Sequence, residues 1–177
     1  MWYHRIAPFA TTERKQRKPG DRKLAESATS IQKVFESVVQ TDRYPKSEIN
    51  IQIQVLQADG GALPSAINAV TLALLDAGIA MSEFVVSCSA GYLEKTPILD
   101  LNYIESSGDG PEIPVAYLAT TEKISMIQLN YRIPLHICDA VIDLAVEGCK
   151  QIYDLMQNEV REYTLKRLNS RGMIEAR

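Results

Sequence analysis

The stretch Ile49-Asn50-Ile51-Gln52-Ile53-Gln54-Val55-Leu56-Gln57-Ala58-Asp59-Gly60-Gly61 joins a regularly patterned strand to a glycine turn. Its first seven residues alternate apolar and amide side chains, and this period of two predicts a strand with one buried face. A helix is expected next, with Pro64 in its first turn, an end near Ala77 and Gly78 as its cap. Apolar residues on more than one face predict that this helix belongs to the core: Ile67, Val70, Leu72, Leu74 and Leu75.

The segment before this stretch predicts a strand, a basic loop and a helix. The strand extends from Tyr3 to Ala10, and the polar loop covers residues 11–20. Asp21 is a suitable N-cap for a helix that ends near Gln40. One stripe of this helix has the three- and four-residue spacing of a buried face: Leu24, Ala28, Ile31, Phe35 and Val38.

The segment after the stretch predicts several strands and a long helix. Strands are expected at Phe84–Leu93 and Ile98–Leu101, a turn at Ser106–Gly110, and a hairpin formed by Pro114–Ala119 and Ile124–Tyr131. From Leu135 the apolar spacing becomes helical, with a buried face formed by Ile137, Val141, Leu144, Ile152, Met156 and Tyr163.

The composition is that of an ordinary globular protein. The 177 residues, 46% hydrophobic and 23% charged, are enough for one core. No run approaches the roughly 20 apolar residues of a transmembrane helix, so no membrane partner is expected. Three cysteines without metal-ligand spacing predict buried thiols in a reduced compartment and no metal site: Cys88, Cys138 and Cys149. The element order predicts an α+β fold in one domain over 1–171, with a frayed tail at 172–177.

The charge is distributed unevenly along the chain. Residues 1–23 contain seven Lys/Arg against Glu13 and Asp21, so this segment carries +5. Because the whole chain carries −3, the remainder carries −8. A basic segment on an acidic body is typical of a protein with a polyanion partner. A solvated loop would have the same composition, and charge alone leaves both interpretations open.

Three places have the residue types that chemistry needs. Gly60 and Gly61 stand before a helix N-terminus, whose free N–H groups and positive dipole end suit phosphate, although a double glycine is more often a plain turn. Asp100 and Glu94 flank a short bend, where two carboxylates can bind a divalent cation or share acid and base roles. Solvated surface acids are the ordinary alternative for this pair.

The third place is the basic run that ends at the start of the first helix. Cations at a helix N-terminus oppose the dipole, so Arg22 and Lys23 are a slightly unfavourable choice for a purely structural face. A run of this kind can contact an RNA backbone, but the dipole effect is only a few tenths of a kcal/mol and does not decide between the two interpretations. The residues of the run are Arg14, Lys15, Arg17, Lys18, Arg22 and Lys23.

Several blocks together resemble the RNase PH-like family. Val55–Gly61 resembles its signature loop, and Leu72–Ile79 resembles the helix and cap that follow. Ser87–Tyr92 and Ile98–Asn102 match the next two blocks, and Gly20–Lys23, with Glu13-Arg14-Lys15 before it, matches the basic loop and helix start. The blocks keep the family's order and spacing from about Tyr3 to Arg171. Within the family the chain is most similar to the eukaryotic exosome ring subunit whose archaeal counterpart is catalytic.

The resemblance implies a fold of the ribosomal-protein-S5 domain 2-like type. It also implies a six-membered ring of RNase PH-like heterodimers, with RNA-binding cap proteins on one face, RNA in the central pore and a separate hydrolytic nuclease. In such rings, basic residues at the positions of Arg22 and Lys23 line the channel. A location in nucleus, nucleolus and cytoplasm follows from the family. Because family members begin with more strands, we expect an N-terminally truncated chain that lacks the first strands of its sheet.

The resemblance also locates a departure in the active site. Active relatives follow the two glycines with a small residue and then an arginine that holds phosphate; here these positions are Ala62 and Leu63. Leucine cannot replace a bidentate guanidinium. Asp100 matches the family aspartate, and Glu94 stands where active members have aspartate. We therefore expect a non-catalytic exosome subunit that needs no cofactor.

The alternative is a phosphorolytic 3′–5′ exoribonuclease. It would use inorganic phosphate and Mg²⁺, with Asp100 as general acid or metal ligand and Glu94 assisting it.

Overall fold

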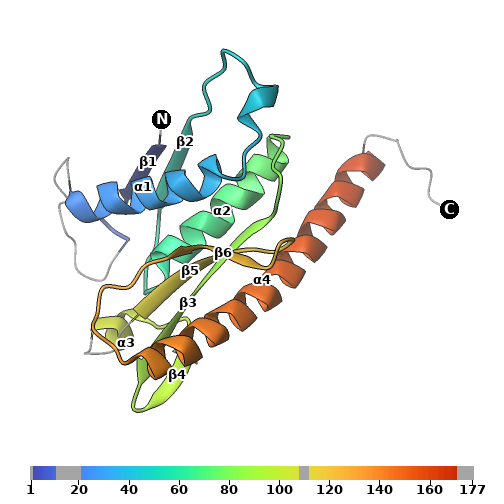
Figure 1. Ribbon diagram of the computed structural model, residues 1–177. Coiled ribbons are helices and arrows are strands. Elements are labelled where there is room, and N and C mark those ends of the chain that lie inside the picture. Colours follow the sequence, from blue (N-terminus) through green and yellow to red (C-terminus); the bar gives the residue numbers. More distant parts are fainter. Residues whose placement is uncertain (1, 11–20, 108–111, 171–177) are drawn as a thin grey trace.

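A four-stranded antiparallel sheet separates two layers of helices in the computed structural model, which describes residues 2–10, 21–107 and 112–170 (Figure 1). Helices α1 and α2 cover one face of the sheet, and the long helix α4 crosses the other. The strand order is β4-β3-β5-β6. The strands are β3 (Val85–Leu93), β4 (Thr96–Leu99), β5 (Glu112–Leu118) and β6 (Lys123–Ile127), and the helices are α1 (Arg22–Glu36), α2 (Ala62–Asp76), α3 (Tyr103–Ser107) and α4 (Leu135–Ser170).

A second, two-stranded sheet is formed by β1 (Trp2–Ile6) and β2 (Ile51–Val55). These strands are parallel, and their register runs from the pair Trp2/Ile51 to the pair Ile6/Val55. Parallel neighbours need a crossover connection, which α1 and the short 3₁₀ helix η1 (Thr41–Arg43) provide. The expected alternation of β2 is confirmed, since its isoleucines and valine are half-buried and its glutamines are exposed.

The core is divided by the sheet because successive strand residues face opposite sides. Val85 and Ala116 pack with Ile31 and Phe35 of α1 and Ile67 of α2. On the opposite face, β3 and β5 pack against α4 through Val86, Cys88, Tyr117, Cys149 and Met156. The predicted buried stripe of α1 is confirmed at Ile31, Phe35 and Val38, with Asp21 as the N-cap.

Side chains of α2 take the place of a neighbouring strand beside β3. Strand β4 pairs with β3 only over Ala90–Leu93, and within the described residues no strand pairs with the same edge of β3 from Val85 to Ser89. The Asn68 amide donates to the Ser87 carbonyl at 2.8 Å and accepts from the Ser87 N–H at 2.7 Å. Thr71 Oγ1 donates to the Val85 carbonyl at 2.7 Å. These bonds fix the position of α2 along the sheet edge.

Several predicted boundaries are corrected by the structure. The expected start of α2 is confirmed, since the helix begins at Ala62 with Gly61 as its N-cap and Pro64 lies in its first turn. The first helix ends at Glu36 rather than near Gln40, and β4 begins two residues earlier than expected. Within the expected turn at Ser106–Gly110, the described residues 106 and 107 belong to α3. Residues 11–20 and the predicted frayed tail at 172–177 lie outside the described part of the chain.

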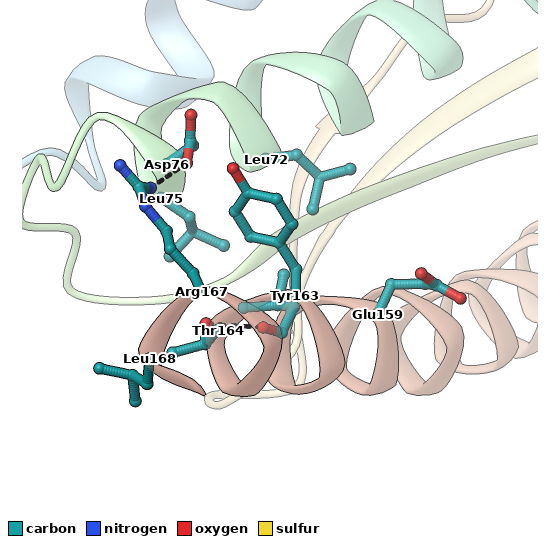
Figure 2. A pocket seen from close by; sticks show the side chains of 9 residues that line it. Leu72, Leu75, Asp76, Glu159, Tyr163, Thr164, Arg167 and Leu168 are labelled. Carbon is teal, nitrogen blue, oxygen red and sulfur yellow. Dashed lines mark hydrogen bonds and ion pairs between the residues drawn. The ribbon is translucent and has the colours of Figure 1, made fainter. Parts of the chain in front are cut away.

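Two residues expected in the core are exposed instead. Leu72 of α2 is 37% exposed and Tyr163 of α4 is 54% exposed. Both line a groove of about 580 Å³ between the two helices, and Figure 2 shows the Tyr163 side chain pointing toward α2. Arg167 of α4 lies over the Tyr163 ring and forms an ion pair with Asp76 of α2 at 2.9 Å. The helical pattern continues beyond Met156, the last residue of α4 buried against the sheet, so these two side chains face the groove and not the core.

Replacing Asn68 with alanine tests whether α2 is held by its bonds to β3. The N–H and carbonyl of Ser87, a fully buried residue, would both lose their partner, and each such loss costs about 1–3 kcal/mol. We expect Asn68→Ala to lower the free energy of unfolding by about 2–4 kcal/mol, measured by urea denaturation. The control is Asn158→Ala on the exposed face of α4, which should have little effect. Equal effects of the two substitutions would contradict the assignment.

Candidate functional site

The glycine loop lies against the backbone that follows β4. Gly60 has φ +101° and Gly61 has φ +53°, both in the left-handed region that favours glycine. A Cβ on Gly60 would lie 2.0 Å from the carbonyl oxygen of Leu101, which no structure tolerates. Asp59 Oδ1 also accepts the N–H of Tyr103 at 3.3 Å. The loop therefore needs glycine for its shape and for its contact with Leu101.

Asp100 lies at the N-terminus of α2. Its N–H donates to the Ser89 carbonyl at 2.9 Å, and its φ is +52°. A Cβ on Gly61 would lie 2.9 Å from Asp100 Oδ1, so this exposed carboxylate stands beside the N-cap of the helix. A negative charge is favoured there by the helix dipole. The structure thus brings Asp100 and the glycine loop together, two places that the sequence analysis treated separately.

Glu94 lies far from Asp100, at the opposite end of β4. Glu94 and Lys95 form the exposed two-residue turn between β3 and β4, with φ +48° and +66°. Asp100 pairs opposite Ser89 at the other end of β4, five residues away along β3. Five strand residues span about 16 Å. The two carboxylates therefore flank the whole of β4 and not a short bend, and the structure does not bring them together.

Glu112 is the second carboxylate near Asp100, and the sequence analysis missed it. Glu112 starts β5 opposite Gly91 of β3. Its partial burial raises the pKa of its carboxyl group, the nearby Ser89 hydroxyl lowers it, and the charge of Asp100 raises it further. Among the described side chains, the buried Ser89 hydroxyl has no partner in good hydrogen-bond geometry. The cross-strand register that joins these residues is not visible in the sequence.

The residues after the glycines belong to the helix and the core. Ala62 is the first residue of α2, and Leu63 packs against the core cluster that contains Ile67 and Phe35. The side chain at the position expected to hold phosphate is thus apolar and used for packing. Asp100 and Glu112 add negative charge beside the same helix end. Like charges repel, so this arrangement is unfavourable for a phosphate dianion.

Arg22 and Lys23 are the described members of the basic run, and both are solvent-exposed at the start of α1. Arg22 Nε forms an ion pair with Glu26 Oε1 at 2.8 Å, and the two side chains are 90% and 51% exposed. Lys23 is also exposed, and its backbone N–H donates to the Asp21 carboxylate at 3.1 Å. Four of the residues predicted to contact RNA lie outside the described part of the chain: Arg14, Lys15, Arg17 and Lys18.

The cysteines are placed largely as expected. Cys88 and Cys149 are buried between the sheet and α4, whereas Cys138 is half-buried. Burial raises the pKa of the Cys88 thiol to about 11 and that of the Cys149 thiol to about 12. Within residues 2–10, 21–107 and 112–170, no group of three or more His, Cys, Asp or Glu is placed to hold a metal ion. The same ranges contain no helix long and apolar enough to cross a membrane.

Two consecutive segments of the chain match the two domains of the 3′ exoribonuclease family, RNase PH. Residues 3–80 match domain 1 of this family, and residues 83–136 match domain 2. The first match contains the glycine loop and α2, and the second contains Asp100 and Glu112.

Sequence relatives are exosome proteins. The chain is 43% identical to the Exosome complex component RRP41 homolog of Arabidopsis thaliana, over 90% of this chain and 66% of the relative. It is 38% identical to Exosome complex component RRP41 of Homo sapiens, over 89% and 64%. Identity to Exosome complex component SKI6 of Saccharomyces cerevisiae is 34%, over 93% and 67%. The chain thus spans about two thirds of the length of these relatives.

Solved structures share the fold. Rice (Oryza sativa) Rrp46 has a TM-score of 0.76 at 21% identity, with 82% of this chain and 69% of that chain covered. The Archaeoglobus fulgidus exosome with RNA bound to the active site has a TM-score of 0.69 at 15% identity, with 86% and 70% covered. At these identities the similarity establishes the fold alone, and it confirms the expected RNase PH-like architecture.

Substituting Gly60 tests the close approach of the loop to Leu101. In Gly60→Ala the new methyl group overlaps the Leu101 carbonyl, so we expect a loss of several kcal/mol in unfolding free energy. The matched control is Gly78→Ala, which also has a positive φ, +73°, but has nothing within 4 Å of the added carbon. Its expected cost is about 1–2 kcal/mol of left-handed strain. Equal losses in the two variants, measured by denaturant unfolding, would refute the steric argument.

The raised pKa of Glu112 predicts a pH-dependent stability. Because the folded-state pKa lies above the ordinary value of 4.5, stability is lost as the pH rises from that value through the folded-state pKa. Glu112→Gln removes this penalty, so we expect a higher thermal midpoint than wild type at pH 7 and no difference near pH 3. Glu94→Gln at the exposed turn is the control. A lower midpoint for Glu112→Gln at pH 7 would contradict the assignment.

Proposed function

This chain belongs to the RNase PH-like 3′ exoribonuclease family, and from that premise we propose that it is a non-catalytic core subunit of an RNA exosome. It forms part of a six-membered RNase PH-like ring and of the RNA channel used in 3′–5′ RNA processing and degradation. Its partners are other RNase PH-like subunits, RNA-binding cap proteins and a separate hydrolytic nuclease. It acts in the nucleus, nucleolus and cytoplasm. The names of the relatives support the exosome assignment.

The packing of Leu63 is the observation that carries the non-catalytic part of the proposal. Phosphorolysis needs a phosphate dianion held beside the scissile bond, and a guanidinium does this through two charge-assisted hydrogen bonds. Leu63 offers no donor and lies against the core. Losing such a contact commonly costs several kcal/mol, which corresponds to orders of magnitude in rate. The helix N–H groups alone remain, and Asp100 stands next to them.

An RNA-contact role is supported by the position of the basic residues. Arg22 and Lys23 are exposed at the start of α1, and the chain outside residues 1–23 is strongly acidic. Exposed cations on an acidic body attract a polyanion to that segment and repel it elsewhere. In this role the subunit positions RNA for the separate nuclease without breaking a bond itself.

The alternative is a phosphate-dependent 3′–5′ exoribonuclease that releases nucleoside diphosphates. One observation favours it, since Asp100 and Glu112 supply two carboxylates near an open helix N-terminus. In that case Asp100 would protonate the leaving oxygen or help to bind Mg²⁺, and Glu112 would take the assisting role first assigned to Glu94. Inorganic phosphate would be the attacking group.

An RNA degradation assay distinguishes the two functions. The chain is assembled with its RNase PH-like partners, without the hydrolytic nuclease, and incubated with labelled single-stranded RNA with and without phosphate. We expect no phosphate-dependent release of nucleoside diphosphates. The control complex carries Asp100→Asn in this chain. Diphosphate release that requires phosphate and disappears with Asp100→Asn would overturn the non-catalytic assignment.

Reversing the charge of Arg22 and Lys23 tests the RNA contact in the same complex. We expect the Arg22→Glu, Lys23→Glu variant to bind single-stranded RNA several-fold more weakly, with a smaller salt dependence because fewer counterions are released. The matched control reverses two exposed charges on α4, Lys150→Glu and Lys166→Glu. Unchanged RNA affinity in the α1 variant, or an equal loss in the α4 variant, would refute the channel assignment.

A further inference from the structure

A shallow groove of about 550 Å³ lies between α1 and the outer strand β6. One wall is formed by α1, with Arg22, Glu26, Thr29 and Lys33. The other is formed by the end of β6 and the residue after it, Ile127 and Gln128. The wall of α1 is polar and charged, whereas Ile127 is a large apolar side chain that is 44% exposed.

The two cations of this groove share one face of the helix. Arg22 and Lys33 are eleven residues apart, which corresponds to slightly more than three full turns at 3.6 residues per turn. The two side chains therefore project in nearly the same direction, about 16 Å apart along the axis. The side chain of Lys23 is rotated by about 100° about the helix axis from this direction, and it does not line the groove. The geometry thus pairs Arg22 with a lysine that sequence analysis did not select.

The carboxylate of Glu26 is the negative charge that lines the groove, and its ion pair with Arg22 is weak. Glu26 bonds to Arg22, but both side chains are largely exposed, and surface pairs of this kind contribute little because water and salt screen them. A phosphate group can therefore compete with Glu26 for the guanidinium, and Arg binds phosphate bidentately. Lys33 is exposed as well, one turn before the helix ends.

We propose that single-stranded RNA lies in the groove between α1 and β6, with its phosphates on Arg22 and Lys33 and with Glu26 as a brake on affinity. The occupant follows from charge, since a polyanion neutralises both cations, and from Arg22, which lines the groove and also belongs to the residues proposed to contact RNA. The apolar side chain of Ile127 provides a surface for a base or sugar on the opposite wall. This inference rests on the proposed RNA-channel function. It extends the RNA-contact surface along α1 by about three helical turns, from Arg22 to Lys33.

Two variants with opposite expected effects on RNA affinity test the groove, in the complex assembled with the RNase PH-like partners. The probe is a 5′-fluorescein-labelled oligouridylate, and binding is followed by fluorescence anisotropy over a salt series. Lys33→Ala should weaken binding several-fold and make the slope of log K against log salt less negative by about 0.7, the value for one phosphate contact on a single strand. Glu26→Gln should tighten binding several-fold. A purely structural role for Glu26 would not increase RNA affinity.

The controls separate this inference from the proposed function. Lys150→Ala on α4 should leave affinity and salt slope unchanged. If Arg22→Glu with Lys23→Glu weakens binding while Lys33→Ala and Glu26→Gln have no effect, the groove is refuted and the channel function stands. If none of these α1 variants changes binding, both fail. A photo-crosslinking benzoylphenylalanine at Thr29 should label RNA, and labelling of a protein subunit while RNA is bound would instead identify the groove as a peptide site.

Discussion

The close approach of Gly60 to the Leu101 carbonyl constrains the rest of the structure. It holds the end of β2 against the segment that leaves β4, although these segments are about 40 residues apart in the sequence. Helix α2 therefore starts beside Asp100 and runs along the part of the β3 edge that β4 does not pair with. There Asn68 and Thr71 bond to the strand backbone and replace a missing neighbour. The position of α2 in turn gives α1 and the apolar side of the sheet a common core.

The same constraint explains why the helix N-terminus is a poor phosphate site here. With the loop fixed, Leu63 faces the core and is used for packing, while Asp100 is placed beside Gly61. Glu112 adds a second carboxylate whose raised pKa reflects its partial burial and the nearby charge. The helix end thus carries acidic groups where the family resemblance leads us to expect a phosphate-binding cation. Arg22 and Lys23, the described cations of the basic run proposed to contact RNA, lie at the start of α1.

Sequence periodicity predicted the elements well and their contacts less well. The alternation of Ile51, Ile53 and Val55 and the stripe of Ile31 and Phe35 are local patterns, and both were confirmed. Tyr163 shows the limit, because a helical pattern does not reveal where the sheet beneath it ends. The composition of the candidate site was harder to predict, because tertiary contacts decide which side chains meet there. Asp100 was found through its motif, whereas Glu94 was misplaced and Glu112 was missed, because strand register decides which carboxylates meet.

The most direct test of the account is a high-resolution structure of the chain, assembled with its RNase PH-like partners, with single-stranded RNA and phosphate bound. The account predicts RNA phosphates along α1 at Arg22, and no phosphate between Gly61 and Asp100. An RNA 3′ end at the N-terminus of α2, with an ordered phosphate beside Gly61 and Asp100, would contradict it.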